Sequence, residues 1–141
     1  MTKILFVCHG NICRSPMAEF VMKDLVKKAG LADRFEIASV AVSREEIGNP
    51  VYPPARRELQ KHGIRCDGHA ARQITRRDLE HFDRIYYMDS SNGRYLQRLF
   101  GSGNWEPLLD RDVADPWYSG DFQQTWEDIL EGCTRILEEL A

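Results

Sequence analysis

The sequence is organised around one segment near its N-terminus, where an apolar run, a loop and an amphipathic run follow one another without a break. The apolar run Ile4–Val7 predicts a buried strand, and apolar residues recur with helical spacing over residues 17–28. Between them lies the loop Cys8-His9-Gly10-Asn11-Ile12-Cys13-Arg14-Ser15. Gly10 and Asn11 allow the unusual backbone angles that a tight loop needs. This order of strand, loop and helix favours an α/β fold.

The residue types in the loop predict an anion site beside a nucleophile. A loop that leads into a helix N-terminus turns several backbone N–H groups toward one point, where the helix dipole adds positive potential. Arg14 can donate two parallel hydrogen bonds to a phosphoryl group, and the same field favours the thiolate of Cys8. Ser15 is expected to cap the helix, with Pro16 as its first residue. We therefore expect the Cys8 sulfur to attack a bound phosphoryl group.

The octet CHGNICRS contains the pattern Cys-x5-Arg-Ser, the signature of cysteine-dependent phosphatases. Its N-terminal position and its second cysteine resemble the low-molecular-weight protein tyrosine phosphatases, and the resemblance extends over essentially the whole chain. It implies hydrolysis of phosphotyrosine and aryl phosphate monoesters through a phosphocysteine on Cys8. The expected phosphate contacts are His9, Gly10, Asn11, Ile12, Cys13, Arg14 and Ser15. Supporting hydrogen bonds are expected from Asn11, Ser15 and His69, the last because it matches a supporting histidine of the family.

A second segment, Asp115-Pro116-Trp117-Tyr118, contains the candidate general acid. A leaving phenol oxygen benefits from a proton, which Asp115 can supply. Pro116 fixes the backbone beside the acid, and the two aromatic residues can stack on a substrate ring. The segment resembles the general-acid loop of the family. Asp110 and Asp112 are nearby alternatives without the proline and aromatic residues; Asp115 could also be a plain turn residue and the aromatic pair part of the core.

Residues 43–48 correspond to one wall of the active-site cleft in the resembled family, which often carries an aromatic residue there. Here the segment contains Glu45 and Glu46, and no aromatic residue precedes Tyr52, so this wall departs from the family pattern. The resemblance implies phosphotyrosine rather than phosphoserine, because the cleft of the family is deep. Relatives that act on phosphoarginine tend to carry threonine in place of Ile12. Tyrosine-phosphorylated proteins are therefore the expected partners.

The rest of the chain alternates between strand and helix patterns. Strands are predicted at 35–38, 84–88 and 105–109, helices at 53–62, 75–81, about 90–100 and 122–140, and irregular loops at 39–54 and 110–120. Pro107 makes the last strand an edge strand, and the apolar stripe of the last helix is expected to pack on the sheet. The pattern predicts an open four-stranded parallel sheet with helices on both faces. The resemblance implies the strand order 2-1-3-4, in which the Cys8 loop lies at the switch point.

The bulk properties are those of one globular domain covering residues 1–141. The formal net charge of −3 argues against nucleic acid as a partner, and the N-terminal apolar run is too short for a secretory signal or a membrane span. The four cysteines are scattered, so we expect reduced thiols, a cytoplasmic location and neither a cofactor nor a metal. Cys13 could capture a sulfenate on Cys8 as a reversible disulfide, with plain packing as the alternative.

Three other functions fit parts of the sequence. Cys8-x4-Cys13 with Cys66-x2-His69 would supply four zinc-type ligands, although the first pair lies in a loop suited to phosphate. A thiol-dependent arsenate reductase on the same scaffold needs a further cysteine pair late in the chain, where only Cys133 follows Cys66. A protein-arginine phosphatase on the same scaffold is the third alternative.

Overall fold

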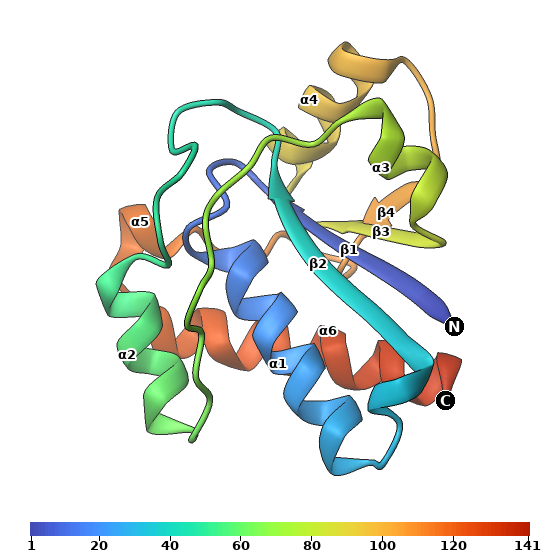
Figure 1. The fold of residues 1–141 in the computed structure, drawn as a ribbon. Helices are drawn as coiled ribbons and strands as arrows, with labels where there is room; N and C mark the ends of the chain where they lie inside the picture. Colours follow the sequence, from blue (N-terminus) through green and yellow to red (C-terminus); the bar gives the residue numbers. More distant parts are fainter.

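A computed structural model describes residues 1–141, and its centre is a sheet of four parallel strands (Figure 1). The strands are β1 (Thr2–Cys8), β2 (Phe35–Ala41), β3 (Arg84–Tyr87) and β4 (Trp105–Pro107). They lie in the order β2-β1-β3-β4, and every neighbouring pair is parallel. The predicted α/β class, strand order and edge position of β4 are confirmed. Because the chain reverses direction beside β1, the loop after β1 opens at the point where such sheets bind ligands.

Helices cover both faces of the sheet, as predicted. Figure 1 shows α3 (Arg76–His81) and α4 (Ser90–Phe100) on one side, with α1 (Arg14–Lys28), α2 (Pro53–Lys61) and α6 (Phe122–Leu140) on the other. The central strand β1 divides its side chains between the two cores: Ile4 and Phe6 pack toward α1 and α6, whereas Leu5 and Val7 pack toward α4. All four are fully buried, which explains the continuous apolar run in this part of the sequence.

Helix α6 packs mainly along α1, so the prediction that its apolar stripe lies on the sheet is only partly right. Its residues Ile129, Cys133 and Ile136 join the core that includes Ile4 of β1. A Cβ atom on Gly132 would lie 2.5 Å from the Leu108 side chain, so glycine permits the close approach of α6 to the segment after β4. No helix in the structure has the length and apolar composition of a membrane-spanning segment.

Most helix boundaries agree with the prediction, and α3 begins with a capping box formed by Thr75 and Asp78. The predicted N-cap of α1 is wrong: Cys13 is the N-cap residue and the helix begins at Arg14. The hydroxyl of Ser15 instead forms hydrogen bonds with the Asn11 side chain and the Val40 carbonyl oxygen. Strand β2 continues to Ala41, three residues into the predicted loop, because its pairing with β1 extends to Cys8.

Three further differences concern short elements. The predicted irregular loop 110–120 contains helix α5 (Pro116–Ser119), which begins with Asp115 as N-cap and Pro116 as first residue. This combination is a known helix-start signal that the sequence contains. Strand β4 ends at Pro107 rather than 109, and an unpredicted 3-10 turn, η1, covers Ala32–Arg34.

Candidate active site

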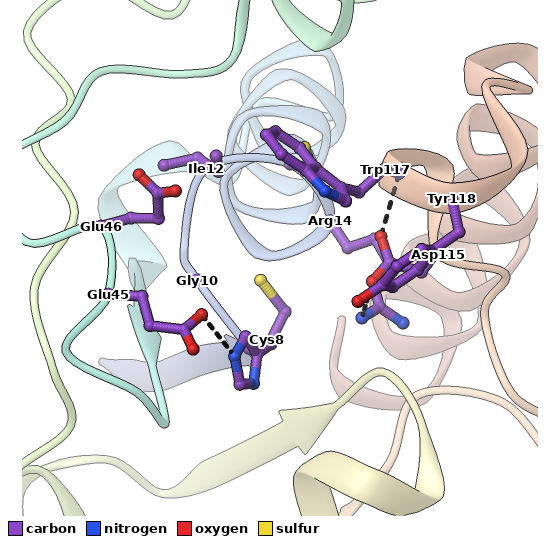
Figure 2. Close-up of a pocket in the computed structure, with 11 residues that line it drawn as sticks. Cys8, Gly10, Ile12, Arg14, Glu45, Glu46, Asp115, Trp117 and Tyr118 are labelled. Atoms are coloured by element: carbon purple, nitrogen blue, oxygen red, sulfur yellow. Dashed lines mark hydrogen bonds and ion pairs between the residues drawn. The ribbon is translucent and has the colours of Figure 1, made fainter.

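The loop after β1 lines a cavity of about 220 Å³ at the carboxyl end of the sheet (Figure 2). Figure 2 shows the sulfur of Cys8 between the loop at Gly10 and the side chain of Arg14, with Asp115 and Trp117 beyond. The lining residues come from three segments and are Cys8, His9, Gly10, Ile12, Cys13, Arg14, Glu45, Glu46, Asp115, Trp117 and Tyr118. Of the expected phosphate contacts, only Asn11 and Ser15 do not line the cavity.

The backbone of the loop is arranged to bind an anion. Its carbonyl groups are tied to neighbouring segments: those of Cys8 and His9 accept hydrogen bonds from Val42 and Ser43, and that of Ile12 accepts one from Tyr52. The N–H groups of Gly10, Ile12 and Cys13 have no acceptor within the chain. A row of free amide donors at the start of a helix is the arrangement that holds phosphate groups in proteins.

Asn11 holds this loop in shape from behind. It is the one residue other than glycine with a positive φ, at 60°, and it is fully buried. Its side-chain amide donates to Ser15 Oγ at 2.8 Å and to Ser39 Oγ at 2.9 Å, while its Oδ1 accepts from the Arg72 N–H at 3.2 Å. Nε2 of His69 is 2.8 Å from the Asn11 carbonyl oxygen. The three residues predicted to support the loop, Asn11, Ser15 and His69, therefore form one hydrogen-bond network.

Ser39 and Glu19 extend this network, and no local sequence pattern predicts a role for either residue. Ser39 Oγ donates to Glu19 Oε1 at 2.6 Å, and Glu19 Oε2 accepts from Lys23 at 2.6 Å. The Glu19 side chain is nearly buried on the inner face of α1. Because the buried side-chain polar atoms of Asn11, Ser39 and Glu19 all have partners, this network can fix the loop without an unpaired group.

The sulfur of Cys8 is at the centre of the loop and almost buried. It lies 3.0 Å from Ser15 Oγ and accepts a hydrogen bond from the Asn11 N–H at 3.3 Å. Since Ser15 Oγ already accepts from Asn11, its own proton is available to the sulfur or to the Val40 carbonyl. Both neighbours of the sulfur are thus groups that can donate to a thiolate.

Arg14 is 2% exposed and held by three acceptors. Its Nη1 donates to Asp89 Oδ2 and to the Val113 carbonyl oxygen, both at 2.8 Å, and its Nη2 donates to Asp115 Oδ2 at 3.3 Å. Burial opposes the charge, but the negative charges of Cys8, Asp115 and Asp89 outweigh it and raise the pKa of Arg14 above its ordinary value. Two of the five guanidinium N–H donors remain for a ligand.

Asp89 belongs to the site, although the sequence analysis does not single it out, because an aspartate just before a helix has a sufficient local role as its N-cap. It does cap α4, since its Oδ1 accepts from the Asn92 N–H at 2.8 Å, but its other oxygen binds Arg14. One carboxylate therefore fixes both the start of α4 and the orientation of the guanidinium. Its position just after β3, beside the switch point of the sheet, is a signal that could have placed it near the site.

Of the three candidate acids, only Asp115 lines the cavity. Its Oδ1 accepts from the Trp117 N–H at 3.0 Å and its Oδ2 from Arg14, and its side chain is 28% exposed. Asp112 instead binds Ser90 at the start of α4, and Asp110 lies on the surface beside Arg111. Cavity position therefore separates Asp115 from its rivals.

The aromatic residues after Asp115 form one wall of the cavity. Trp117 and Tyr118 are 52% and 86% exposed, so the alternative that they belong to the core is wrong. The Trp117 ring leans against Tyr52, with ring centroids 4.8 Å apart. Both rings are therefore accessible to the aromatic part of a substrate.

The opposite wall carries two carboxylates in place of the aromatic residue. Glu45 Oε2 is 2.8 Å from His9 Nε2, and Glu46 Oε2 accepts from Asn49 Nδ2 at 2.6 Å. Both glutamates line the cavity, and Figure 2 shows them across from Asp115 and Tyr118. The departure from the family pattern thus makes this wall acidic.

The other cysteines differ from Cys8 in their surroundings. Burial and the charge of Cys8 raise the pKa of Cys13 to about 12, which keeps that thiol neutral at ordinary pH. Cys133 is fully buried beneath α1 and does not reach the cavity, which disfavours an arsenate reductase relay. No group of three or more His, Cys, Asp or Glu side chains is arranged to hold a metal, and His69 is engaged with Asn11.

Comparisons with known proteins agree with this geometry. The family model described as low molecular weight phosphotyrosine protein phosphatase matches residues 3–141. The low molecular weight protein-tyrosine-phosphatase YfkJ of Bacillus subtilis is 39% identical, over 99% of this chain and 96% of its own. The chain therefore belongs to the low molecular weight phosphotyrosine protein phosphatase family.

Solved structures show the same fold. The crystal structure of YfkJ superposes with a TM-score of 0.95 at 38% identity, covering 99% of this chain and 94% of the other. That of the Streptococcus pyogenes phosphatase SP-PTP gives 0.94 at 39% identity, with 100% and 94% coverage. A third similar structure is DARP, described as a Drosophila arginine phosphatase, with a TM-score of 0.90, 32% identity and coverage of 98% and 97%.

Proposed function

We propose that this chain hydrolyses phosphotyrosine and other aryl phosphate monoesters through a phosphocysteine on Cys8. The observation that carries the proposal is that the Cys8 sulfur, the Arg14 guanidinium and the Asp115 carboxylate line one cavity. Membership of the family supports the same reaction. Tyrosine-phosphorylated proteins are then the partners, and one domain over residues 1–141 contains the whole site. The cytoplasmic location stays a prediction.

In the first step, the Cys8 sulfur attacks phosphorus and the bond to the phenol oxygen breaks. The free loop N–H groups and the two remaining donors of Arg14 stabilise the negative charge on the three equatorial oxygens. Asp115 gives its proton to the leaving oxygen.

In the second step, water attacks phosphorus and the sulfur–phosphorus bond breaks. Asp115, now ionised, accepts the proton of the attacking water, and inorganic phosphate leaves. The Ser15 hydroxyl, 3.0 Å from the sulfur, can donate to the thiolate as it departs. Cys8 is restored, so the cycle consumes only the ester and one water.

Replacing Asp115 with asparagine separates the acid role from binding. We expect the rate of phenyl phosphate hydrolysis to fall by about a hundredfold, because a poor leaving group needs the proton. Hydrolysis of an activated nitrophenyl ester should fall by less than about tenfold, since its phenolate leaves unaided. Steady-state kcat/KM for both esters measures this, because it reports the steps up to departure of the phenol and not the later hydrolysis of the phosphocysteine. Equal losses on the two esters would remove Asp115 from the acid role.

Features of the cavity favour phosphotyrosine over phosphoarginine. Ile12 lines the cavity and packs with Cys13 and Ala71, so the loop presents an apolar side chain at this position. It offers no hydrogen bond to a phosphorylated guanidinium, whereas an aromatic ring can pack on it and on Trp117. The similarity to an arginine phosphatase of known structure makes phosphoarginine the second candidate substrate.

A direct rate comparison decides between these substrates. We expect matched peptides carrying phosphotyrosine to be hydrolysed with a kcat/KM at least about a hundredfold higher than peptides carrying phosphoserine or phosphoarginine. Phosphate release by the wild-type chain measures the ratio, and Cys8→Ser gives the background. A faster rate on phosphoarginine would replace the proposed function with that of an arginine phosphatase.

The role of Cys13 as a redox partner also stays a prediction, and one observation favours it. Part of the rise in the pKa of Cys13 comes from the charge on Cys8. Oxidation of Cys8 to a neutral sulfenic acid removes that charge, so the Cys13 thiol ionises more readily when a resolving thiolate is needed.

A further inference from the structure

The rim of the cavity carries more negative than positive charge. The side chains that line it outside the phosphate loop include three carboxylates, Glu45, Glu46 and Asp115, and no lysine. The single lining arginine, Arg14, is buried and already paired with Asp89 and Asp115. A bound phosphoryl dianion would occupy its remaining donors. The outer part of the cleft is therefore an acidic surface over a cationic floor.

The two glutamates are held beside the cavity by contacts within their wall. Glu45 is paired with His9, whose ring makes an edge contact with Tyr95 at 5.6 Å between centroids. Glu46 binds the Asn49 side chain, and its Cγ would be 3.3 Å from a Cβ atom on Gly10. The wall thus packs directly on the phosphate loop.

The backbone of this wall is also tied to the rest of the fold. The N–H of Gly48 donates to the Ala71 carbonyl, and the N–H of Ala71 donates to the Asn49 carbonyl, each at 2.8 Å. These bonds fix the position of the C-terminal end of the wall. The Glu45 side chain remains 68% exposed, so its charge faces solvent at the mouth of the cleft.

We propose that Glu45 and Glu46 select phosphotyrosine peptides with lysine or arginine beside the phosphotyrosine and disfavour peptides with acidic residues there. This rests on the proposed function, since it concerns the same site. A phosphotyrosine whose phosphoryl group reaches the loop leaves its flanking residues at the mouth of the cleft. Basic flanks are attracted to the two carboxylates, and acidic flanks are repelled by them.

The size of this preference follows from the exposure of the groups. One exposed ion pair changes a binding constant by about two- to fivefold, and two carboxylates acting on two flanking charges give about a tenfold preference. Arg44, the one basic residue of this wall, is exposed and does not line the cavity. The His9 ring lies 2.8 Å from Glu45, so all peptides are compared at one pH.

The test compares three phosphotyrosine peptides of equal length with flanking lysines, alanines or glutamates, at about pH 8 and low salt. The wild-type chain is expected to hydrolyse the lysine peptide with a kcat/KM about tenfold above that of the glutamate peptide. In the double variant Glu45→Gln/Glu46→Gln this ratio should fall below about threefold. The kcat/KM ratio of the two peptides is taken within each protein, so a loss of activity that affects all substrates equally does not change it.

Glu138→Gln is the matched control, because Glu138 is an exposed residue near the end of α6, which Figure 1 places at the far end of the sheet from the loop. It should retain the wild-type ratio. A ratio near one in the wild-type chain, or an unchanged ratio in the double variant, would overturn the inference while leaving the phosphatase function intact. Failure of the wild-type chain to hydrolyse any phosphotyrosine peptide or nitrophenyl phosphate would overturn both.

Discussion

Replacing Cys8 with serine is expected to lower the hydrolysis of aryl phosphates below about 1% of the wild-type rate. A hydroxyl at this position fits, because the sulfur already lies within hydrogen-bonding distance of Ser15 Oγ and the Asn11 N–H. It remains protonated where a thiolate would be ionised, so it is a poor nucleophile. Turnover of nitrophenyl phosphate measures the loss.

The same variant should still bind oxyanions. The free N–H groups of the loop and the donors of Arg14 do not depend on the sulfur, so inorganic phosphate is expected to bind with an affinity within about tenfold of wild type. Calorimetric titration with phosphate provides this control and shows that the loop is folded. Residual turnover above about 1% would exclude Cys8 as the nucleophile, because the reaction would then proceed without its thiol.

Replacing Arg14 with lysine is expected to reduce kcat/KM by about a hundredfold or more, although the charge is retained. The guanidinium makes three hydrogen bonds to the protein and keeps two donors for the ligand, whereas an ammonium has three donors in all. It therefore cannot satisfy Asp89, Val113 and Asp115 and also hold two phosphoryl oxygens. Kinetics on nitrophenyl phosphate measure the loss.

Folding must be separated from catalysis in this variant, because Arg14 is buried among two carboxylates. A thermal melt identifies any loss of stability. Arg56→Lys is the matched control, since both side chains of the Arg56–Asp67 ion pair are exposed to solvent. Near-normal kinetics for a folded Arg14→Lys protein would contradict the role of a planar, two-donor cation. Normal kinetics are expected for Arg56→Lys.

The parts of the site that the sequence predicted are those encoded within one local segment. Cys8 and Arg14 share a single loop, and the strand and helix patterns on either side of it are strong. The carboxyl end of a parallel strand then defines where the loop opens. Asp115 was found because the proline and aromatic residues beside it form a second local pattern.

The parts that the sequence did not predict depend on contacts between distant segments. Asp89 has an adequate local explanation as a helix cap, and only the fold reveals that its second oxygen binds Arg14. Ser39 and Glu19 carry no local signal, since their role comes from the packing of β2 against α1. Ser15 shows the reverse: its residue type favours an N-cap, but its hydroxyl forms hydrogen bonds with Asn11 in the loop and with Val40 on β2.

The most direct test of the account is to identify the group that carries phosphate during turnover. The Asp115→Asn variant, in which water is activated poorly, should accumulate the intermediate when mixed with nitrophenyl phosphate and quenched in acid. Peptide mapping by mass spectrometry is expected to find one phosphoryl group on the peptide containing Cys8, and none after the same treatment of Cys8→Ser. Phosphate on any other residue, or turnover with no phosphorylated peptide at any quench time, would contradict a phosphocysteine on Cys8.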